Sequence, residues 1–413
     1  MKHSTRVAWL LAVVSMVSYA MRVDVSVAQE QMAPALGLGM ADMGIITGWG
    51  FQLAYALFQL PAGALGDRYG ARLVLGLSIL GWSVAAFASA LVPGTGTAAF
   101  VTLFAVRSLL GASQAAMYPV ASLAVTEYVP AERRTTTVSV YIATATLGAA
   151  LTPLLFTPLM THFGWRVVFA ASGTLGLATA VLWFALAPRE TRARPYDARG
   201  TADRTAVPLG QQLRAVMHLL GNRPLMLLST SYLLHSGVFF VFVFWFFRYL
   251  TEARGLTLSE SGLWASVPTA LAFVLGPMIG MYADRIGRRW KPAPARRAVA
   301  MACLGLFAVL VLAGTYITTS WLAIVVVGLA VACLNAAEAP FWATSAALGG
   351  GQPGAAGGVL NLMGNLGGVI TISLVPMAKD AFGWTALLVG LAALAVVAAM
   401  LWMTVRLDDP PPT

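Results

Sequence analysis

Twelve long apolar segments, separated by polar stretches, constrain the fold of this chain more than any other feature. About 20 apolar residues are enough to cross the hydrocarbon core of a bilayer. Backbone N–H and C=O groups find no water inside lipid, so each segment is predicted to be an α-helix. The sequence therefore predicts an all-α membrane protein with twelve transmembrane helices. The predicted spans are 7–29, 43–65, 73–92, 97–127, 135–160, 165–187, 224–250, 259–283, 298–316, 320–349, 354–378 and 383–406.

The composition and the placement of charge agree with this topology. Hydrophobic residues make up 59% of the chain and charged residues 10%, whereas a soluble domain has about 25% charged residues. If the N-terminus is cytoplasmic, twenty of the 26 basic residues fall in cytoplasmic segments and four fall outside. Because Lys and Arg gather on the cytoplasmic side, we predict a multi-pass protein of the bacterial inner membrane with both termini cytoplasmic. The net charge of +10 then needs no nucleic-acid partner.

One charged loop occurs twice, once in each half of the chain. The first copy reads Gly63-Ala-Leu-Gly-Asp-Arg-Tyr-Gly-Ala-Arg72, and the second, 217 residues later, reads Gly280-Met-Tyr-Ala-Asp-Arg-Ile-Gly-Arg-Arg289. A repeat of this length, placed between apolar spans, is typical of duplicated transporters. We therefore predict two pseudo-symmetric six-helix bundles, at residues 1–187 and 224–413, joined by a cytoplasmic linker at 188–223.

The charged side chains of the repeated loop are predicted to form a cytoplasmic gate. An Asp at one helix end would pair with Arg residues at neighbouring helix ends in one conformation and release them in another. The alternative is a positively charged loop in which the acidic residue has no special role. The predicted gating residues are Asp67, Arg68, Arg72, Asp284, Arg285 and Arg288.

Ionisable side chains inside the spans are few, and a charge in the bilayer interior costs several kcal/mol, so each is a functional candidate. Arg22 in the first span and Arg107 in the fourth would together bind a carboxylate, whose geometry matches the guanidinium fork. The alternatives are that each arginine pairs with a neighbouring acid for structural reasons, or that Arg22 snorkels toward the membrane surface. Asp24 is two residues from Arg22 and so points to a different side of the helix.

Polar side chains near the two arginines are candidates for substrate contact. Tyr19 is three residues from Arg22, and Gln114 and Tyr118 continue the helical face of Arg107. Interhelical hydrogen bonds would produce the same polar stripes without any role in binding. The predicted substrate contacts are Arg22, Arg107, Tyr19, Gln52, Tyr55, Gln114, Tyr118 and Asn365.

The loop at residues 63–72 resembles the signature of the major facilitator superfamily, Gly-x-Leu-x-Asp-Arg-x-Gly-x-Arg, and the resemblance extends over the twelve spans. It implies two six-helix bundles around a central cavity that opens alternately to the two sides. In that family helices 1, 4, 7 and 10 line the cavity. The interior ionisable residues fall on these four spans: Arg22, Asp24, Arg107, His235 and Glu338.

A narrower resemblance is to the anion:cation symporter branch, which includes bacterial sugar-acid carriers and vesicular glutamate and sialic acid carriers. It implies a substrate that is an organic carboxylate, held by Arg22 and Arg107, and transport that is coupled to protons or driven by voltage. The motifs that carry it are Tyr19-x-x-Arg22, Arg107-x-x-x-Gly111, Pro119, Ala339-Pro-Phe-Trp-Ala343 and Gly364-Asn-Leu-Gly-Gly368.

The chain departs from this branch at two positions that bear on proton coupling. The branch often has an acid immediately before the span-1 arginine and a Glu seven residues after the span-4 arginine, where this chain has Met21 and Gln114. Those acids are the usual proton carriers, and Met and Gln cannot titrate. The remaining candidates for proton coupling are Asp24, Glu338 and His235.

We therefore expect a secondary active transporter of a small organic anion, either a sugar acid or another mono- or dicarboxylate, coupled to protons. An uncoupled facilitator or an anion exchanger is the alternative, and a drug:proton antiporter is opposed by the two interior arginines. A non-transporting sensor would need a soluble signalling domain, and none is evident. The chain has no Walker-type phosphate loop and no His/Cys cluster with metal-ligand spacing. No enzyme activity, cofactor or metal is predicted, and the protein is expected to be a monomer.

Overall fold

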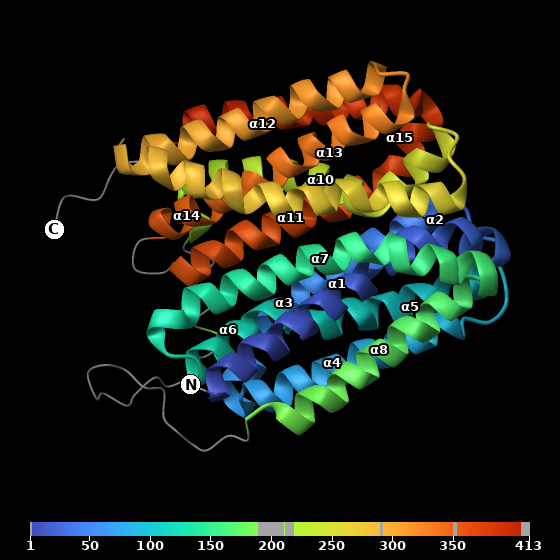
Figure 1. Ribbon diagram of the computed structural model, residues 1–413, viewed down its shortest axis with the longest axis horizontal. Coiled ribbons are helices and arrows are strands. Elements are labelled where there is room, and N and C mark those ends of the chain that lie inside the picture. The colour runs from blue at the N-terminus through green and yellow to red at the C-terminus, as the bar shows by residue number, and fades with distance from the viewer. Residues whose placement is uncertain (1, 189–209, 211–218, 290–291, 350–352, 406–413) are drawn as a thin grey trace. The chain divides into compact units, whose positions relative to one another are not determined.

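The computed structural model describes residues 2–188, 210, 219–289, 292–349 and 353–405, and these residues contain helices but no strand. Figure 1 labels these helices except η1. They are α1 (Lys2–Ala35), α2 (Met40–Ile45), the π-helix η1 (Ile46–Leu53), α3 (Ala54–Tyr69), α4 (Ala71–Ala90), α5 (Thr97–Gln114), α6 (Met117–Tyr128), α7 (Ala131–Phe163), α8 (Trp165–Leu186), α10 (Arg223–Glu252), α11 (Leu258–Arg289), α12 (Pro292–Tyr316), α13 (Ser320–Ala336), α14 (Glu338–Leu348) and α15 (Pro353–Thr404).

The helices account for the twelve predicted spans. Within the described residues, ten helical stretches are long and apolar enough to cross a membrane. One of them, α15, contains two predicted spans, because the chain turns at Gly383, where φ is +78°. Glycine adopts this angle readily because it has no Cβ. The segments α2, η1 and α3 follow one another directly over the remaining predicted span, 43–65. The prediction of an all-α membrane fold is confirmed.

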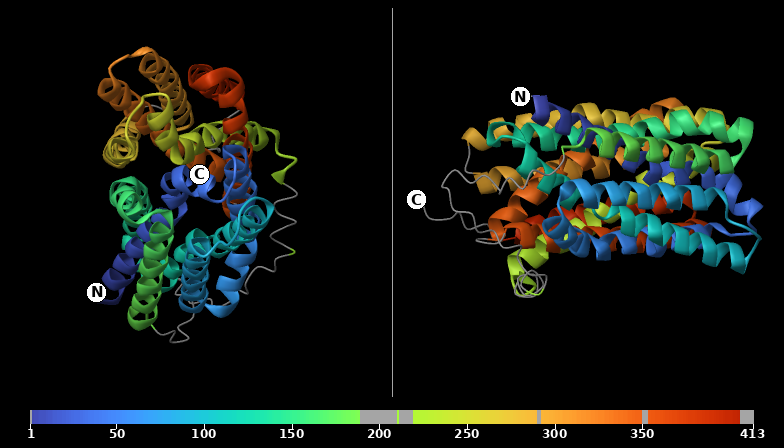
Figure 2. Two further views of the ribbon diagram at one scale, coloured as in Figure 1. Left: turned by 90° about the vertical axis from the view of Figure 1, so that its right-hand side faces the viewer. Right: turned by 90° about the horizontal axis from the view of Figure 1, so that it is seen from below.

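The chain forms two compact units, Met1–Gln211 and Gln212–Thr413. In the first unit α1 packs along α7, and α4 along α8; in the second, α10 packs along α15, and α11 along α13. Figure 2 shows the helices of the first unit, coloured blue to green, nearly end-on in its left view. The predicted linker at 188–223 lies mostly outside the described residues, so the predicted boundaries of the bundles stay a prediction.

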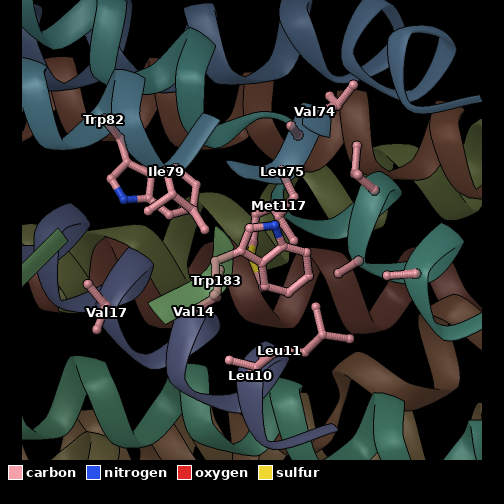
Figure 3. Packing of buried hydrophobic residues seen from close by; sticks show 14 of the residues in the cluster. Leu10, Leu11, Val14, Val17, Val74, Leu75, Ile79, Trp82, Met117 and Trp183 are labelled. Carbon is pink, nitrogen blue, oxygen red and sulfur yellow. The ribbon is translucent and has the colours of Figure 1, made fainter. Parts of the chain in front are cut away.

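The core of the first unit lies where α1, α4, α6 and α8 meet. Large side chains from these helices are buried there, and Figure 3 shows the ring of Trp183 between residues of α1 and α4. Since lipid is as apolar as these side chains, close packing holds the helices together in the bilayer more than exclusion of water does. The labelled core residues are Leu10, Leu11, Val14, Val17, Val74, Leu75, Ile79, Trp82, Met117 and Trp183.

The fourth and tenth spans are each broken near the middle. The fourth divides into α5 and α6 after Gln114, and the tenth into α13 and α14 just before Glu338. Pro119 and Pro340 follow the two breaks. Proline has no backbone N–H, so neither residue can bond to the carbonyl four residues earlier, which lies at the break. The breaks put the side chains of Gln114 and Glu338 at helix ends in mid-span.

In each unit an arginine side chain donates a hydrogen bond to a backbone carbonyl at the end of the last helix. In the first unit, Nη2 of Arg72 donates to the carbonyl oxygen of Phe184 over 2.5 Å, and the indole of Trp183 donates to the Arg72 carbonyl over 2.8 Å. In the second unit, Nη2 of Arg297 donates to the carbonyl oxygen of Val405 over 2.5 Å. Cations at helix C-termini are favourable because the final carbonyls have no partner in the helix.

These contacts bear on the predicted gate. Arg72 uses its guanidinium within the first unit, at the end of α8, and Arg68 is exposed. The side chains of the other predicted gating residues lie outside the described residues, so their gating role stays a prediction: Asp67, Asp284, Arg285 and Arg288.

Two glycines allow very close helix contacts, one in each unit. A Cβ at Gly148 of α7 would lie 2.2 Å from the carbonyl oxygen of Met16 on α1. A Cβ at Gly367 of α15 would lie 2.0 Å from the carbonyl oxygen of Leu233 on α10. Both obstacles are backbone atoms, so a larger residue would force the helices apart. Small residues are common at such contacts in membrane proteins.

Replacing Gly367 by Ala is expected to destabilise the protein by about 1–3 kcal/mol, the usual effect of overpacking. Gly390→Ala is the matched control, because Gly390 also lies within α15, beyond the turn at Gly383, and its Cβ would meet nothing within 4 Å. Thermal unfolding of the purified variants in detergent measures the difference. Equal melting temperatures for the two variants would contradict the close approach of α10 and α15.

Candidate functional site

A buried ion pair lies inside the first unit. Nη2 of Arg107 on α5 is 3.1 Å from Oδ1 of Asp24 on α1, and the two side chains are 2% and 1% exposed. The Arg107 guanidinium also lies over the ring of Phe169 on α8, 5.0 Å from its centroid. The pair therefore joins three helices and balances the charge of Arg107 within the protein.

Arg22 lies on a different side of α1 and has a different environment. It is 3% exposed, and its guanidinium carbon lies 4.3 Å from the ring centroid of Tyr55, 4.7 Å from that of Tyr19 and 5.3 Å from that of Phe51. Its Nε donates to Oε1 of Gln114 over 3.4 Å. Its Nη2 is buried and has no hydrogen-bond partner among the described residues. Aromatic rings attract a cation but do not neutralise it.

Gln114 is held in one orientation by bonds at both ends of its amide. Its Nε2 donates to the carbonyl oxygen of Ser18 over 2.9 Å, and its Oε1 accepts from Arg22. A carboxylate at this position could donate to Ser18 only if it carried a proton. Gln114 thus makes the hydrogen bonds of a protonated acid. Met21, the other departure, is fully buried and points toward Gly176 of α8.

The aromatic wall around Arg22 depends on the π-helix η1. Phe51 lies in η1 and Tyr55 follows in α3, and η1 approaches α5 at Gly111. A Cβ on Gly111 would lie 2.2 Å from the carbonyl oxygen of Phe51, so only glycine permits this approach. Single π-helical turns occur often at functional sites. Local backbone geometry thus brings both rings to the guanidinium.

The other predicted substrate contacts do not all lie near Arg22. Tyr118 meets the Tyr19 ring edge-on, with centroids 6.5 Å apart, and so belongs to the same cluster as Arg22. Gln52 is fully buried in η1. Asn365 lies in the second unit, where its amide donates to the carbonyl of Asn361, one turn earlier in α15, over 2.7 Å. The structure thus brings Tyr19, Tyr55, Gln114 and Tyr118 together around Arg22. Arg107 is not part of this cluster and instead pairs with Asp24.

A second polar cluster, in the second unit, surrounds Glu338 at the start of α14. Its Oε1 accepts from the hydroxyl of Tyr232 over 2.5 Å and from the indole of Trp342 over 2.8 Å. Its Oε2 lies 3.8 Å from Nδ1 of His235. The Glu338 side chain is 41% exposed, whereas that of His235 is 2% exposed. In this pair the imidazole is buried and the carboxylate is exposed.

Stacked rings and one backbone bond hold His235 in place. The imidazole stacks on Tyr232, with centroids 5.5 Å apart, and lies 5.0 Å from the ring of Phe341. Its Nε2 is 2.9 Å from the carbonyl oxygen of Leu334. Ser231, next to Tyr232 in the sequence, instead donates to the carbonyl of Ala398 on α15. Ser231 therefore joins two helices, and Tyr232 and His235 face the acid.

The sequence interpretation missed the apolar members of both clusters. Phe51 and Phe169 contact the two arginines, and Phe341 contacts His235. One aromatic ring in an apolar span is indistinguishable from lipid-facing or core residues in the sequence. The Pro-Phe-Trp run at 340–342 was the available signal, since aromatic side chains follow the acid within one helical turn.

The sequence matches the Major Facilitator Superfamily over residues 8–372. It is 28% identical to the protein named "Probable galactarate/D-glucarate transporter GudP" of Escherichia coli (strain K12), over 95% of this chain and 91% of that protein. It is 26% identical to the D-galactonate transporter of Escherichia coli O6:H1, covering 95% and 93%, and 27% identical to the hexuronate transporter of Bacillus subtilis, covering 92% and 89%.

Solved structures have the same fold. The crystal structure of a bacterial homolog of the human lysosomal transporter Spinster, inward-facing and occupied, gives a TM-score of 0.74 at 17% identity, covering 98% of this chain and 97% of that one. A D-xylose–proton symporter gives a TM-score of 0.70 at 15% identity, with 97% of each chain covered. All these relatives and structures are named as transporters, and the prediction that the chain is not an enzyme is confirmed.

Breaking the ion pair by Asp24→Asn is expected to destabilise the protein by about 3–5 kcal/mol, because Arg107 would keep a buried charge without a partner. Asp24→Asn combined with Arg107→Gln removes both charges and is expected to recover most of the loss. Thermal unfolding of the two single variants, the double variant and the parent completes a double-mutant cycle. Additive effects would show that the two side chains do not interact.

Proposed function

Since this chain belongs to the Major Facilitator Superfamily, we propose that it is a secondary transporter that carries a small organic anion across a membrane by alternating access. Relatives named as sugar-acid transporters favour this class of substrate. The observation that supports it most is Arg22, a buried guanidinium with no acidic partner among the described residues. The substrate carboxylate is that partner.

A carboxylate on Arg22 removes the cost of an unbalanced charge in the bilayer interior. The guanidinium presents its N–H groups in a fork that matches the two carboxylate oxygens. One arm of this fork, Nη2, is unpaired among the described residues. Tyr19 and Tyr55 offer both hydroxyl groups and apolar ring faces, which suit the hydroxyls and C–H faces of a sugar acid.

Counting charges narrows the substrate to a monocarboxylate. Asp24 already balances Arg107. Among the described residues, no other arginine or lysine near the middle of a span lacks an acidic partner besides Arg22. Galactonate and the hexuronates carry one carboxylate, whereas galactarate and glucarate carry two. A second carboxylate would enter the interior without a cation, so a monocarboxylate binds more tightly.

Proton-coupled symport is the form of transport that we favour, with Asp24, Glu338 and His235 as the residues able to bind the proton. An uncoupled facilitator or anion exchanger is the second candidate, supported by Met21 and Gln114 at two family positions for acids. A drug:proton antiporter is disfavoured, because a free guanidinium repels cations. A pH-sensitive dye inside proteoliposomes separates symport from uncoupled transport.

The remaining features of the transporter rest on the sequence. The distribution of Lys and Arg favours an orientation with both termini in the cytoplasm. The relatives from Escherichia coli favour a bacterial inner membrane as the location. The charged loops at 63–72 and 280–289 form the cytoplasmic gate. The protein acts as a monomer, and its partners are the anion, the proton and the lipid bilayer.

Arg22→Gln is expected to abolish uptake of D-galactonate into proteoliposomes, since losing one partner of a buried charge pair costs about 2–5 kcal/mol. Arg22→Lys keeps the charge without the fork and is expected to recover only part of the uptake. Arg166→Gln, which removes an exposed guanidinium at the start of α8, leaves Arg22 intact and serves as the control. Wild-type affinity in Arg22→Gln would disprove the role of this residue.

Galactonate and galactarate test the charge count, because they share a carbon skeleton and differ in the number of carboxylates. D-Galactonate is expected to raise the melting temperature of the protein more than galactarate does at equal concentration, since a ligand stabilises the state that binds it. Galactonate is also expected to be the stronger competitor in uptake. The reverse order would require a second cation at the site.

A further inference from the structure

The geometry between His235 and Glu338 leaves one position for a proton. Nε2 of His235 is 2.9 Å from the Leu334 carbonyl, which only accepts hydrogen bonds, so Nε2 carries the hydrogen of the neutral ring. Nδ1 is then an acceptor, and it is buried with no hydrogen-bond partner among the described residues. It faces Oε2 of Glu338 at 3.8 Å, which also accepts when ionised. Two acceptors face each other, and one added proton would join them.

The other carboxylate oxygen of Glu338, Oε1, explains why the side chain stays in place with or without this proton. Oε1 accepts from Tyr232 of α10 and Trp342 of α14, so its hydrogen bonds are complete. Oε2 therefore remains for the proton. Glu338 is 41% exposed and His235 is 2% exposed, so the carboxylate is the more open of the two groups. A proton bound there would be shared between Oε2 of Glu338 and the almost completely buried imidazole of His235.

No other charged side chain among the described residues contacts this pair from the helices packed on α14. These helices are α10, α12, α13 and α15. On α10, Tyr232 is the titratable neighbour, and its hydroxyl donates to the acid. On α12, Arg296 donates instead to the carbonyl of Ala343. Hydrogen bonds, and no fixed cation among the described residues, thus stabilise the charge of Glu338, so protonating this acid leaves no cation without its partner.

The first unit is less suited to bind the proton. Gln114 already makes the hydrogen bonds of a protonated acid, and Met21 has no titratable group. Asp24 is almost fully buried against Arg107, and protonating it would leave that guanidinium without its partner. This cost favours the ionised form of Asp24 while the pair is intact.

We propose that the proton cotransported with the anion binds between Oε2 of Glu338 and Nδ1 of His235, in the second unit of the chain. The inference rests on the proposed function, because it assigns the coupling site of that transporter. One proton moves with one monocarboxylate, so the substrate and proton together carry no net charge. Proton and anion then bind to separate groups, the proton to the Glu338–His235 pair and the anion to Arg22.

Glu338→Gln tests the assignment in proteoliposomes with D-galactonate as the substrate. The Gln side chain can still accept from Tyr232 and Trp342, and its amide can donate to Nδ1 of His235, as a protonated acid would. The variant is expected to retain exchange of internal for external galactonate. It is expected to lose accumulation driven by a pH gradient, by at least tenfold. Glu260→Gln, an exposed acid at the start of α11, is the matched control.

The outcomes separate this inference from the proposed function. If the parent protein exchanges none of galactonate, a hexuronate or glucarate, the proposed function fails. If exchange and proton-driven accumulation both persist in Glu338→Gln, the coupling site is elsewhere, and the inference fails while the proposed function is retained. Loss of exchange as well would mark Glu338 as a substrate ligand and would overturn the assignment, provided that the melting temperature is unchanged.

Two further measurements complete the test. Asp24→Asn is expected to keep the response to a pH gradient in the fraction of protein that remains folded, and loss of that response with exchange retained would move the proton site to Asp24. Uptake by the parent protein is expected to be unaffected by an imposed membrane potential. A strong dependence on the potential, or no response to a pH gradient, would contradict transport of one proton with one monocarboxylate.

Discussion

The ion pair between Asp24 and Arg107 determines what the other charged groups of the interior can do. A buried guanidinium is less costly when it has a counter-charge, and Asp24 supplies one to Arg107 across the interface of α1 and α5. Arg22 has only a glutamine and aromatic rings. The two arginines are chemically identical but differ in their surroundings: Arg107 has an acidic partner, and Arg22 has none among the described residues.

The two units repeat one backbone plan with different side chains. Both break their fourth helical span before a proline, and both pack two helices together at a glycine. At the first break the polar residue is Gln114, an amide already satisfied by its neighbours, and at the second it is Glu338, an acid beside a histidine. The two units thus interrupt corresponding spans at similar places but have different polar side chains there.

Much of the fold is predictable from the sequence, because apolar length alone determines where helices cross a membrane. The observed ends of α8 and α10, for example, lie within two residues of the predicted spans. The spacing of Arg22 and Asp24 also indicated that their side chains diverge. The identity of the partner of Asp24 was not predictable, because it depends on how α1 and α5 are rotated against each other. The partner of Arg72 is a backbone carbonyl, which every residue has, and the π-helix η1 has no distinct sequence signal.

The arginine that fastens the last helix of each unit has a consequence for biosynthesis. The Arg72–Phe184 contact, and the packing of α4 on α8, join residues that have all been synthesised before α10 begins. Domains tend to fold as units in the order in which the ribosome makes them. The first unit can therefore complete its own helix contacts in the bilayer while the second is still being translated, which shortens the time during which its polar interior faces lipid.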